Sequence, residues 1–153
     1  MKNMRRSDRE ISNEETMQLL NNCEYGVLSS VSESGEPYGV PLSYCLFDDA
    51  IYFHSALEGK KLDNFLANSA VSFCVVGKTE ILQSKFSTKY ESVIVTGIIE
   101  EGTETEKQIG LEGLVKKYSP NFITEGLKYI DKAKDETKVL KLTIKNMTGK
   151  ARK

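Results

Sequence analysis

The chain has 153 residues, and 21 lysine and arginine residues against 22 aspartate and glutamate residues give it a formal net charge of −1. This length predicts one domain spanning residues 1–153, and the absence of a basic excess argues against a nucleic-acid partner. The N-terminal stretch is polar, and no window approaches the roughly 18 apolar residues that a transmembrane helix needs. We therefore expect a soluble, cytoplasmic protein without a membrane partner.

The first part of the chain predicts a short helix followed by an antiparallel meander. Ser12 and Glu15 have the spacing of a capping box, so a helix is expected to begin after Ser12. Residues 26–31 read as a strand, residues 33–36 as a turn, and residues 38–47 as one long strand with alternating side chains. A meander of this kind is typical of an antiparallel sheet.

The next segment predicts an anion-binding site. A turn at residues 48–49 leads into a strand that ends at His54, and the helix that follows opens with Lys60 and Lys61. Free amides of the first helical turn, the Ser55 hydroxyl and the lysine ammonium groups would together supply donors and positive potential to a phosphate. The alternative is that the two lysines form a solvated helix face.

The second part of the chain predicts further strands with helices at the periphery. We expect strands at residues 70–76, 90–100 and 139–144, a loop at 77–89, a helix capped by Thr103 over 106–118, a short helix around 122–130, and a fraying basic tail at 150–153. Six strands joined mainly by tight turns favour a mainly β fold with peripheral helices, a six-stranded antiparallel barrel in which closure removes the edge strands.

The cysteines give no sign of a structural cross-link. Cys23, Cys45 and Cys74 are odd in number and contain no C-x-x-C spacing. Neither a disulfide framework nor a metal site is therefore expected, and reduced, mostly buried thiols fit a cytosolic protein.

Several motifs in order along the chain carry a resemblance to a known family. They are GVPLSY at 39–44, IYFHSALEGKK at 51–61, VSFCVV at 71–76, KYESVIVTG at 89–97 and NMTGK at 146–150. The set resembles the nitroimidazole-resistance (Nim) branch of the pyridoxamine 5′-phosphate oxidase-like FMN-binding split-barrel proteins, and it covers nearly the whole chain. The resemblance implies a split β-barrel homodimer with a flavin, usually FMN, in each of two clefts at the subunit interface. FAD and a deazaflavin are the alternatives.

The resemblance also implies which residues bind the flavin. They are Val40, Pro41, Leu42, Ser43, His54, Ser55, Ala56, Lys60, Lys61, Tyr90, Ser92 and Val93. Lys61 matches the lysine of the family pattern, whereas Lys60 replaces a histidine. Taken without the resemblance, Ser43 and Ser92 are equally well interpreted as polar residues on the open face of a sheet, and Tyr90 as a core or interface aromatic residue.

His54 is the only histidine of the chain. In antibiotic-resistance members of the family the matching histidine is associated with the redox site, which makes His54 the candidate catalytic residue. The alternative interpretation is a strand-end histidine that is hydrogen-bonded to its surroundings.

Two function classes follow from this resemblance. The first is an FMN-dependent, nitroreductase-like oxidoreductase that reduces a small nitro-aromatic or quinone-like acceptor, with the flavin carrying the electron chemistry. The second is a flavin- or haem-binding stress or sensor protein without turnover, since split barrels that only bind share the same fold. Oxidation of pyridoxamine phosphate itself is disfavoured, because all four arginines, Arg5, Arg6, Arg9 and Arg152, lie near the termini.

Overall fold

A computed structural model describes residues 3–153, and its regular elements alternate between strands and short helices. They are α1 (Asn13–Asn22), β1 (Gly26–Val31), β2 (Pro37–Leu42), β3 (Cys45–Phe47), β4 (Ala50–Ser55), α2 (Lys60–Ala67), β5 (Ala70–Leu82), β6 (Ser87–Glu101), α3 (Glu104–Tyr118), α4 (Ile123–Ala133) and β7 (Lys138–Arg152), with single 3₁₀ turns η1 (Ser7–Arg9), η2 (Gln83–Lys85) and η3 (Lys134–Glu136).

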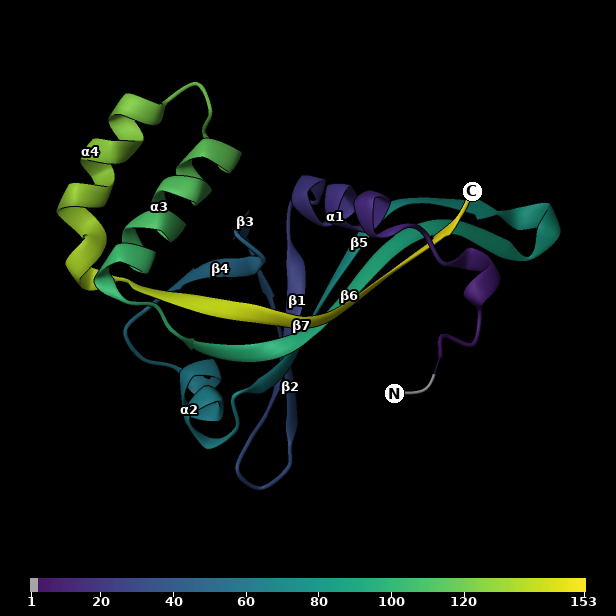
Figure 1. The fold of residues 1–153 in the computed structure, drawn as a ribbon, viewed down its shortest axis with the longest axis horizontal. Coiled ribbons are helices and arrows are strands. Elements are labelled where there is room, and N and C mark those ends of the chain that lie inside the picture. Colours follow the sequence, from purple (N-terminus) through teal and green to yellow (C-terminus); the bar gives the residue numbers. More distant parts are fainter. Residues whose placement is uncertain (1–2) are drawn as a thin grey trace.

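All the strands belong to one antiparallel sheet with the order β2-β1-β5-β6-β7-β4-β3. Figure 1 shows this sheet strongly twisted and curled, with α1 and α2 on opposite sides of the strands and the α3–α4 pair at one end. The prediction of a mainly β, antiparallel split barrel with peripheral helices is confirmed. The sheet has seven strands, one more than predicted.

The additional strand arises because the long strand predicted over residues 38–47 is interrupted. Its first part, β2, pairs with β1 at one edge of the sheet, whereas its second part, β3, pairs with β4 at the other edge. At the break, Tyr44 is completely buried, its hydroxyl donates to the Leu20 carbonyl, and its amide donates to the Tyr118 hydroxyl at 3.0 Å. The expectation that closure removes edge strands was wrong, since β2 and β3 have one neighbour each.

A β-hairpin replaces the loop predicted over residues 77–89. Strands β5 and β6 stay paired from Thr79 opposite Tyr90 to Leu82 opposite Ser87, and Phe86 closes the turn at a left-handed φ of 50°. Figure 1 shows this hairpin projecting at the end of the sheet far from α3 and α4. The loop prediction failed because both faces of the hairpin are largely exposed, so its strands lack the apolar alternation of a half-buried strand.

The C-terminal strand is also longer than predicted. Strand β7 continues to Arg152, which pairs with Tyr90 of β6. The basic tail is therefore strand and not frayed chain. Its glycine has a packing reason: a Cβ on Gly149 would lie 2.2 Å from the Thr16 hydroxyl oxygen, so only glycine lets α1 approach this strand.

The apolar residues form two cores on opposite faces of the sheet. The main core lies inside the curl, where Phe73 makes edge-to-face contacts with Tyr44 and Phe53 at ring-centroid distances of 4.9 and 5.1 Å. The second core lies between the sheet and α3, and includes Tyr52 and Leu114. Strand β4 contributes to both, which explains its nearly continuous apolar sequence.

Helix α3 begins as the sequence predicts. Thr103 accepts a hydrogen bond from the Glu106 amide at 3.2 Å, and the Glu106 carboxylate accepts one from the Thr103 amide at 3.0 Å. The pairing is a complete capping box. Among residues 3–153, no helix is long and apolar enough to cross a membrane.

Candidate functional site

The residues implied to bind a flavin phosphate gather where β4 meets α2. The Ser55 hydroxyl oxygen is buried and has no hydrogen-bond partner among residues 3–153. The first main-chain hydrogen bond of α2 runs from the Asp63 amide to the Gly59 carbonyl at 3.2 Å, so the amides before Asp63 have no acceptor within the helix. Lys60 and Lys61 lie in this first turn. An unpartnered buried hydroxyl beside free amides and two ammonium groups fits a phosphate.

Lys60 and Lys61 differ in their surroundings. The Lys60 ammonium lies 5.0 Å from the ring centroid of Tyr38 on β2, a cation–π contact that joins the helix start to the edge strand. Lys60 is exposed, whereas Lys61 is half-buried. The helix itself is held to β1 by the Asn64 side-chain amide, which donates to the Ser30 hydroxyl at 3.1 Å.

His54 lies on the opposite face of β4 from Ser55. Successive side chains of a strand point to opposite faces, so Ser55 shares the side of Phe53 and His54 the side of Tyr52. His54 is exposed, and its backbone lies opposite Val139 of β7. Its side chain makes no hydrogen bond or ion pair in the part of the chain that the structure describes. The imidazole is therefore free to meet a ligand or a second subunit from outside the barrel.

Residues from β2 divide between the two faces of the sheet. Val40 and Leu42 pack against the main core, whereas Pro41 is exposed on the outer face. Ser43 follows the end of β2 and is also exposed. On β6, Val93 is completely buried in the main core and Ser92 points outward. Only the outward-facing residues of these strands present their side chains to a ligand outside the barrel.

The outer face of the sheet carries an exposed apolar row. The row crosses neighbouring strands through the pairs Pro41–Val27, Val27–Cys74 and Cys74–Ile94. Val27 is 38% exposed and Ile94 is 50% exposed. Val76, one alternation further along β5, is 59% exposed. We call these five residues the outer apolar row. Contiguous exposed apolar residues on a flat sheet face mark an interaction surface.

Tyr90 lies far from Ser55 within one subunit. Ser55 pairs with Lys138 at the start of β7, and Tyr90 pairs with Arg152 at its end. At the usual strand rise, these two positions are separated by about 45 Å of strand. One subunit therefore does not bring Tyr90 and the phosphate-end residues to the same small ligand.

Sequence reasoning missed the basic residues around Tyr90. The Arg9 guanidinium donates to the Tyr90 hydroxyl at 3.4 Å and lies 5.8 Å from its ring centroid. This hydrogen bond, with the charges of Arg9, Lys150 and Arg6, lowers the pKa of Tyr90. The sequence separates Arg9 from Tyr90 by 81 positions, so no local pattern could have joined them.

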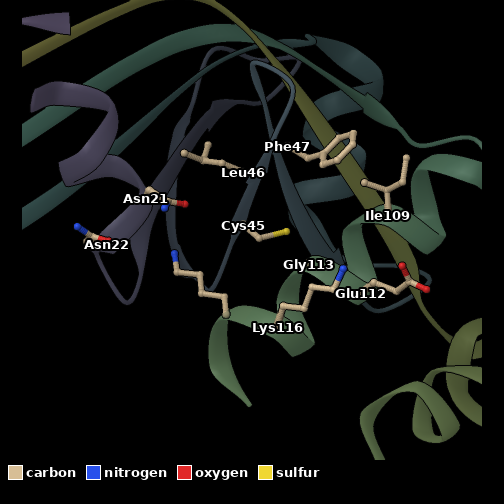
Figure 2. A pocket seen from close by; sticks show the side chains of 10 residues that line it. Asn21, Asn22, Cys45, Leu46, Phe47, Ile109, Glu112, Gly113 and Lys116 are labelled. Atoms are coloured by element: carbon tan, nitrogen blue, oxygen red, sulfur yellow. The ribbon is translucent and has the colours of Figure 1, made fainter. Parts of the chain in front are cut away.

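Two sizeable cavities lie elsewhere, around the end of α1, strand β3 and helix α3. One, of about 470 Å³, is lined by Cys45, Phe47 and Lys117 among others, and Figure 2 shows its lining residues. The second, of about 640 Å³, is lined by Ser43, Lys117 and Tyr118 among others. Of the implied flavin residues, only Ser43 lines either of these two cavities.

The fold and these sites together define a split β-barrel protein with a candidate phosphate site at a helix start and an apolar outer face. Residues 12–151 match the model of the pyridoxamine 5′-phosphate oxidase family. The chain belongs to this family.

Solved structures show the same fold at low sequence identity. A candidate 5-nitroimidazole antibiotic resistance protein from Bacteroides thetaiotaomicron is 23% identical, with 93% of this chain and 86% of that chain covered and a TM-score of 0.77. A FAD-binding protein from Mesorhizobium loti is 23% identical, with 95% and 98% covered and a TM-score of 0.68. A FAD and heme binding protein from Mycobacterium smegmatis is 18% identical, with 95% and 74% covered and a TM-score of 0.82. No curated protein matches the chain in sequence.

Proposed function

We propose that this protein binds FMN as a homodimer and that it is an oxidoreductase, in which FMN that an external electron donor has reduced would pass electrons to a small nitro-aromatic or quinone-like acceptor. The observation that carries the proposal is the buried, unpartnered Ser55 hydroxyl at the end of β4, followed closely in the chain by the free first-turn amides of α2 and by Lys61. Family membership and the flavin-binding relatives with the same fold support it. When bound, the flavin supplies the electron transfer, and the chain supplies binding, orientation and electrostatics.

Two features of one subunit support the proposed homodimer. The outer apolar row is exposed, and a second copy stacked on it would remove these side chains from water. Within one subunit, Tyr90 lies too far from the phosphate-end residues to contact the same flavin. In a dimer of this kind, the second copy would supply Tyr90 and Ser92 to a flavin whose phosphate lies at Lys61 of the first copy. Pro41 and Ser43 are exposed and available to such an interface.

The residues of the chain have separate roles in this proposal. Lys61, Ser55 and the α2 amides bind the phosphate, whereas the Lys60 ammonium makes a cation–π contact with the Tyr38 ring. Pro41 and Ser43 line the path of the flavin along β2, with the backbone of Ala56 at the phosphate end. His54, exposed and on the outer side of β4, donates a proton or a hydrogen bond to the acceptor.

The first experiment is the visible absorption spectrum of the purified protein before and after incubation with FMN and desalting. Flavin absorption that co-elutes with the protein supports the proposal. If the purified protein contains no flavin and binds neither added FMN nor added FAD, the proposal is contradicted. Chromatography of the flavin released by heat then separates FMN from FAD, and reoxidation of the reduced protein by nitro-aromatic or quinone acceptors separates turnover from binding alone.

A second candidate function is a flavin- or haem-binding protein without turnover. The relative from Mycobacterium smegmatis named for both FAD and heme has the same fold, and the exposed imidazole of His54 is a suitable axial ligand for haem iron. A Soret band after incubation with haemin that disappears in His54→Ala supports this candidate. Acceptor-dependent reoxidation no faster than that of free FMN would also favour it.

Lys61→Ala is expected to weaken FMN binding by about 1.5–3 kcal/mol, roughly 10- to 150-fold in Kd, because a charge-assisted hydrogen bond to the phosphate is lost. Lys60→Ala serves as the matched control and is expected to cost less, since Lys60 is exposed and its ammonium rests on the Tyr38 ring. Fluorescence titration of FMN measures both values. Equal, negligible losses in the two variants would show that the phosphate lies elsewhere.

A further inference from the structure

The cavity of about 470 Å³ between α1, β3 and α3 has the composition of a small-molecule site. Figure 2 shows Phe47 and Ile109 on one side, Leu46, Asn21 and Asn22 on the other, and the Cys45 thiol between them. The volume lies within the range of ligand pockets, and the apolar wall suits an aromatic or aliphatic group. A Cβ on Gly113 would lie 2.7 Å from the Cys45 sulfur, so glycine lets α3 approach β3 closely at this wall of the cavity.

Lys117 lines this cavity and also the neighbouring cavity of about 640 Å³. Its ammonium nitrogen is buried and has no hydrogen-bond partner within residues 3–153. The nitrogen lies 3.6 Å from the centroid of the Tyr44 ring, so one side of the ammonium is covered by an aromatic face. A buried ammonium with three unsatisfied donors is costly, and an acceptor from a ligand would remove that cost.

Among residues 3–153, no carboxylate forms an ion pair with Lys117. The neighbouring titratable groups are Tyr44 and Tyr118, whose ring centroids lie 3.6 and 5.3 Å from the ammonium nitrogen, and the buried thiols Cys23 and Cys45. Burial lowers the pKa of Lys117 and raises those of both thiols. Glu112, the carboxylate that lines the cavity, accepts a hydrogen bond from the Gln108 side chain at 3.0 Å. With Lys116 also present, the lining has two cationic side chains against one anionic side chain.

We propose that this cavity binds a small organic anion, whose carboxylate pairs with Lys117 and whose apolar body lies against Leu46, Phe47 and Ile109. The flexible stem of lysine lets the ammonium turn from the Tyr44 ring toward the carboxylate. The amides of Asn21 and Asn22 supply further donors at the rim. The site goes beyond the flavin proposal and does not rest on it, because Lys117 and the phosphate-end residues belong to different elements.

Benzoate is the probe, and benzyl alcohol is its uncharged counterpart. Titration of the full chain, followed by ¹⁵N NMR, is expected to give saturable shifts with benzoate and at least about tenfold weaker binding with benzyl alcohol, because a charge-assisted hydrogen bond is missing. The titration is repeated on protein saturated with FMN, so that benzoate binding in this cavity is distinguished from benzoate binding at the proposed flavin site. Equal binding of the two probes, or no saturable shift with benzoate, would overturn the proposal.

Lys117→Met is expected to weaken benzoate binding at least about tenfold. Lys128→Met, the matched control at an exposed lysine of α4 that lines neither cavity, is expected to change it less than about threefold. Wild-type affinity in Lys117→Met would assign the binding elsewhere. If Lys117→Met does not fold by circular dichroism, Phe47→Ala provides the test, since Phe47 is 47% exposed and its loss does not threaten the core. Undiminished benzoate binding in Phe47→Ala would then contradict the placement.

Discussion

Ile94→Asp is expected to convert the proposed homodimer into monomers and to weaken FMN binding at the same time. Ile94 lies in the outer apolar row and is 50% exposed in one subunit, so the carboxylate is well solvated in the monomer. In a dimer that buries this row, each copy would place an unpaired carboxylate in an apolar interface, which costs several kcal/mol per ion. We expect the dimer dissociation constant to rise by at least about 100-fold.

Light scattering coupled to size-exclusion chromatography measures the mass of the variant, and flavin titration measures its FMN affinity. Tyr129→Asp is the matched control, because Tyr129 is 71% exposed on α4 and lies outside the row. It is expected to stay dimeric with unchanged FMN affinity. A dimeric Ile94→Asp variant would remove the outer apolar row from the interface. Loss of the dimer with full FMN affinity would place the flavin within one subunit.

Phe73→Ala is expected to lower the free energy of unfolding by about 3–5 kcal/mol, the range for removing a large buried aromatic side chain. Phe73 is completely buried and is the only residue that the structure shows in ring contact with both Tyr44 and Phe53 among residues 3–153. A Cβ added at Gly26 would lie 2.3 Å from its ring, so the chain is closely fitted around it. The resulting cavity would have little means to collapse.

Denaturant-induced unfolding followed by circular dichroism measures this change. Phe86→Ala is the matched control, because the same substitution is made at the tip of the β5–β6 hairpin, where the side chain is 96% exposed. We expect it to change the free energy of unfolding by less than about 0.5 kcal/mol. Similar losses in the two variants would contradict the assignment of Phe73 to the centre of the core.

Local patterns were sufficient wherever neighbouring residues decide the structure. The capping box of α3 is formed by Thr103 and Glu106, three positions apart, and the structure has it as predicted. The apolar run of β4 and the lysine-initiated α2 were also predicted, because burial of a strand and the start of a helix depend on adjacent side chains. One of the motifs that resemble the family, residues 51–61, covers β4 and the start of α2, and the others lie mainly on β2, β5, β6 and β7.

Local patterns failed where distant partners decide the structure. The alternation over residues 38–47 continues through Ser43 and Tyr44, but the hydroxyl of Tyr118, 74 positions away, binds Tyr44 at the point where the chain leaves one sheet edge for the other. The hairpin over 77–89 and the end of β7 are held by strand pairing. Polar segments can form such pairs, but their sequences carry no apolar alternation that would predict a strand. Pairing satisfies backbone groups whatever the side chains are.

The sequence by itself determined the class of fold, the family and the candidate phosphate site, because all three rest on contiguous motifs with their own hydrogen-bonding or packing periodicity. Only the tertiary structure decided that Ser55 and Tyr90 lie at opposite ends of one subunit and that Pro41, Val27, Cys74, Ile94 and Val76 form one exposed row. It also decided that the ammonium nitrogen of Lys117 is buried beside two cavities. These features depend on strand register and on the curl of the sheet, and both are set by contacts between residues far apart in the chain.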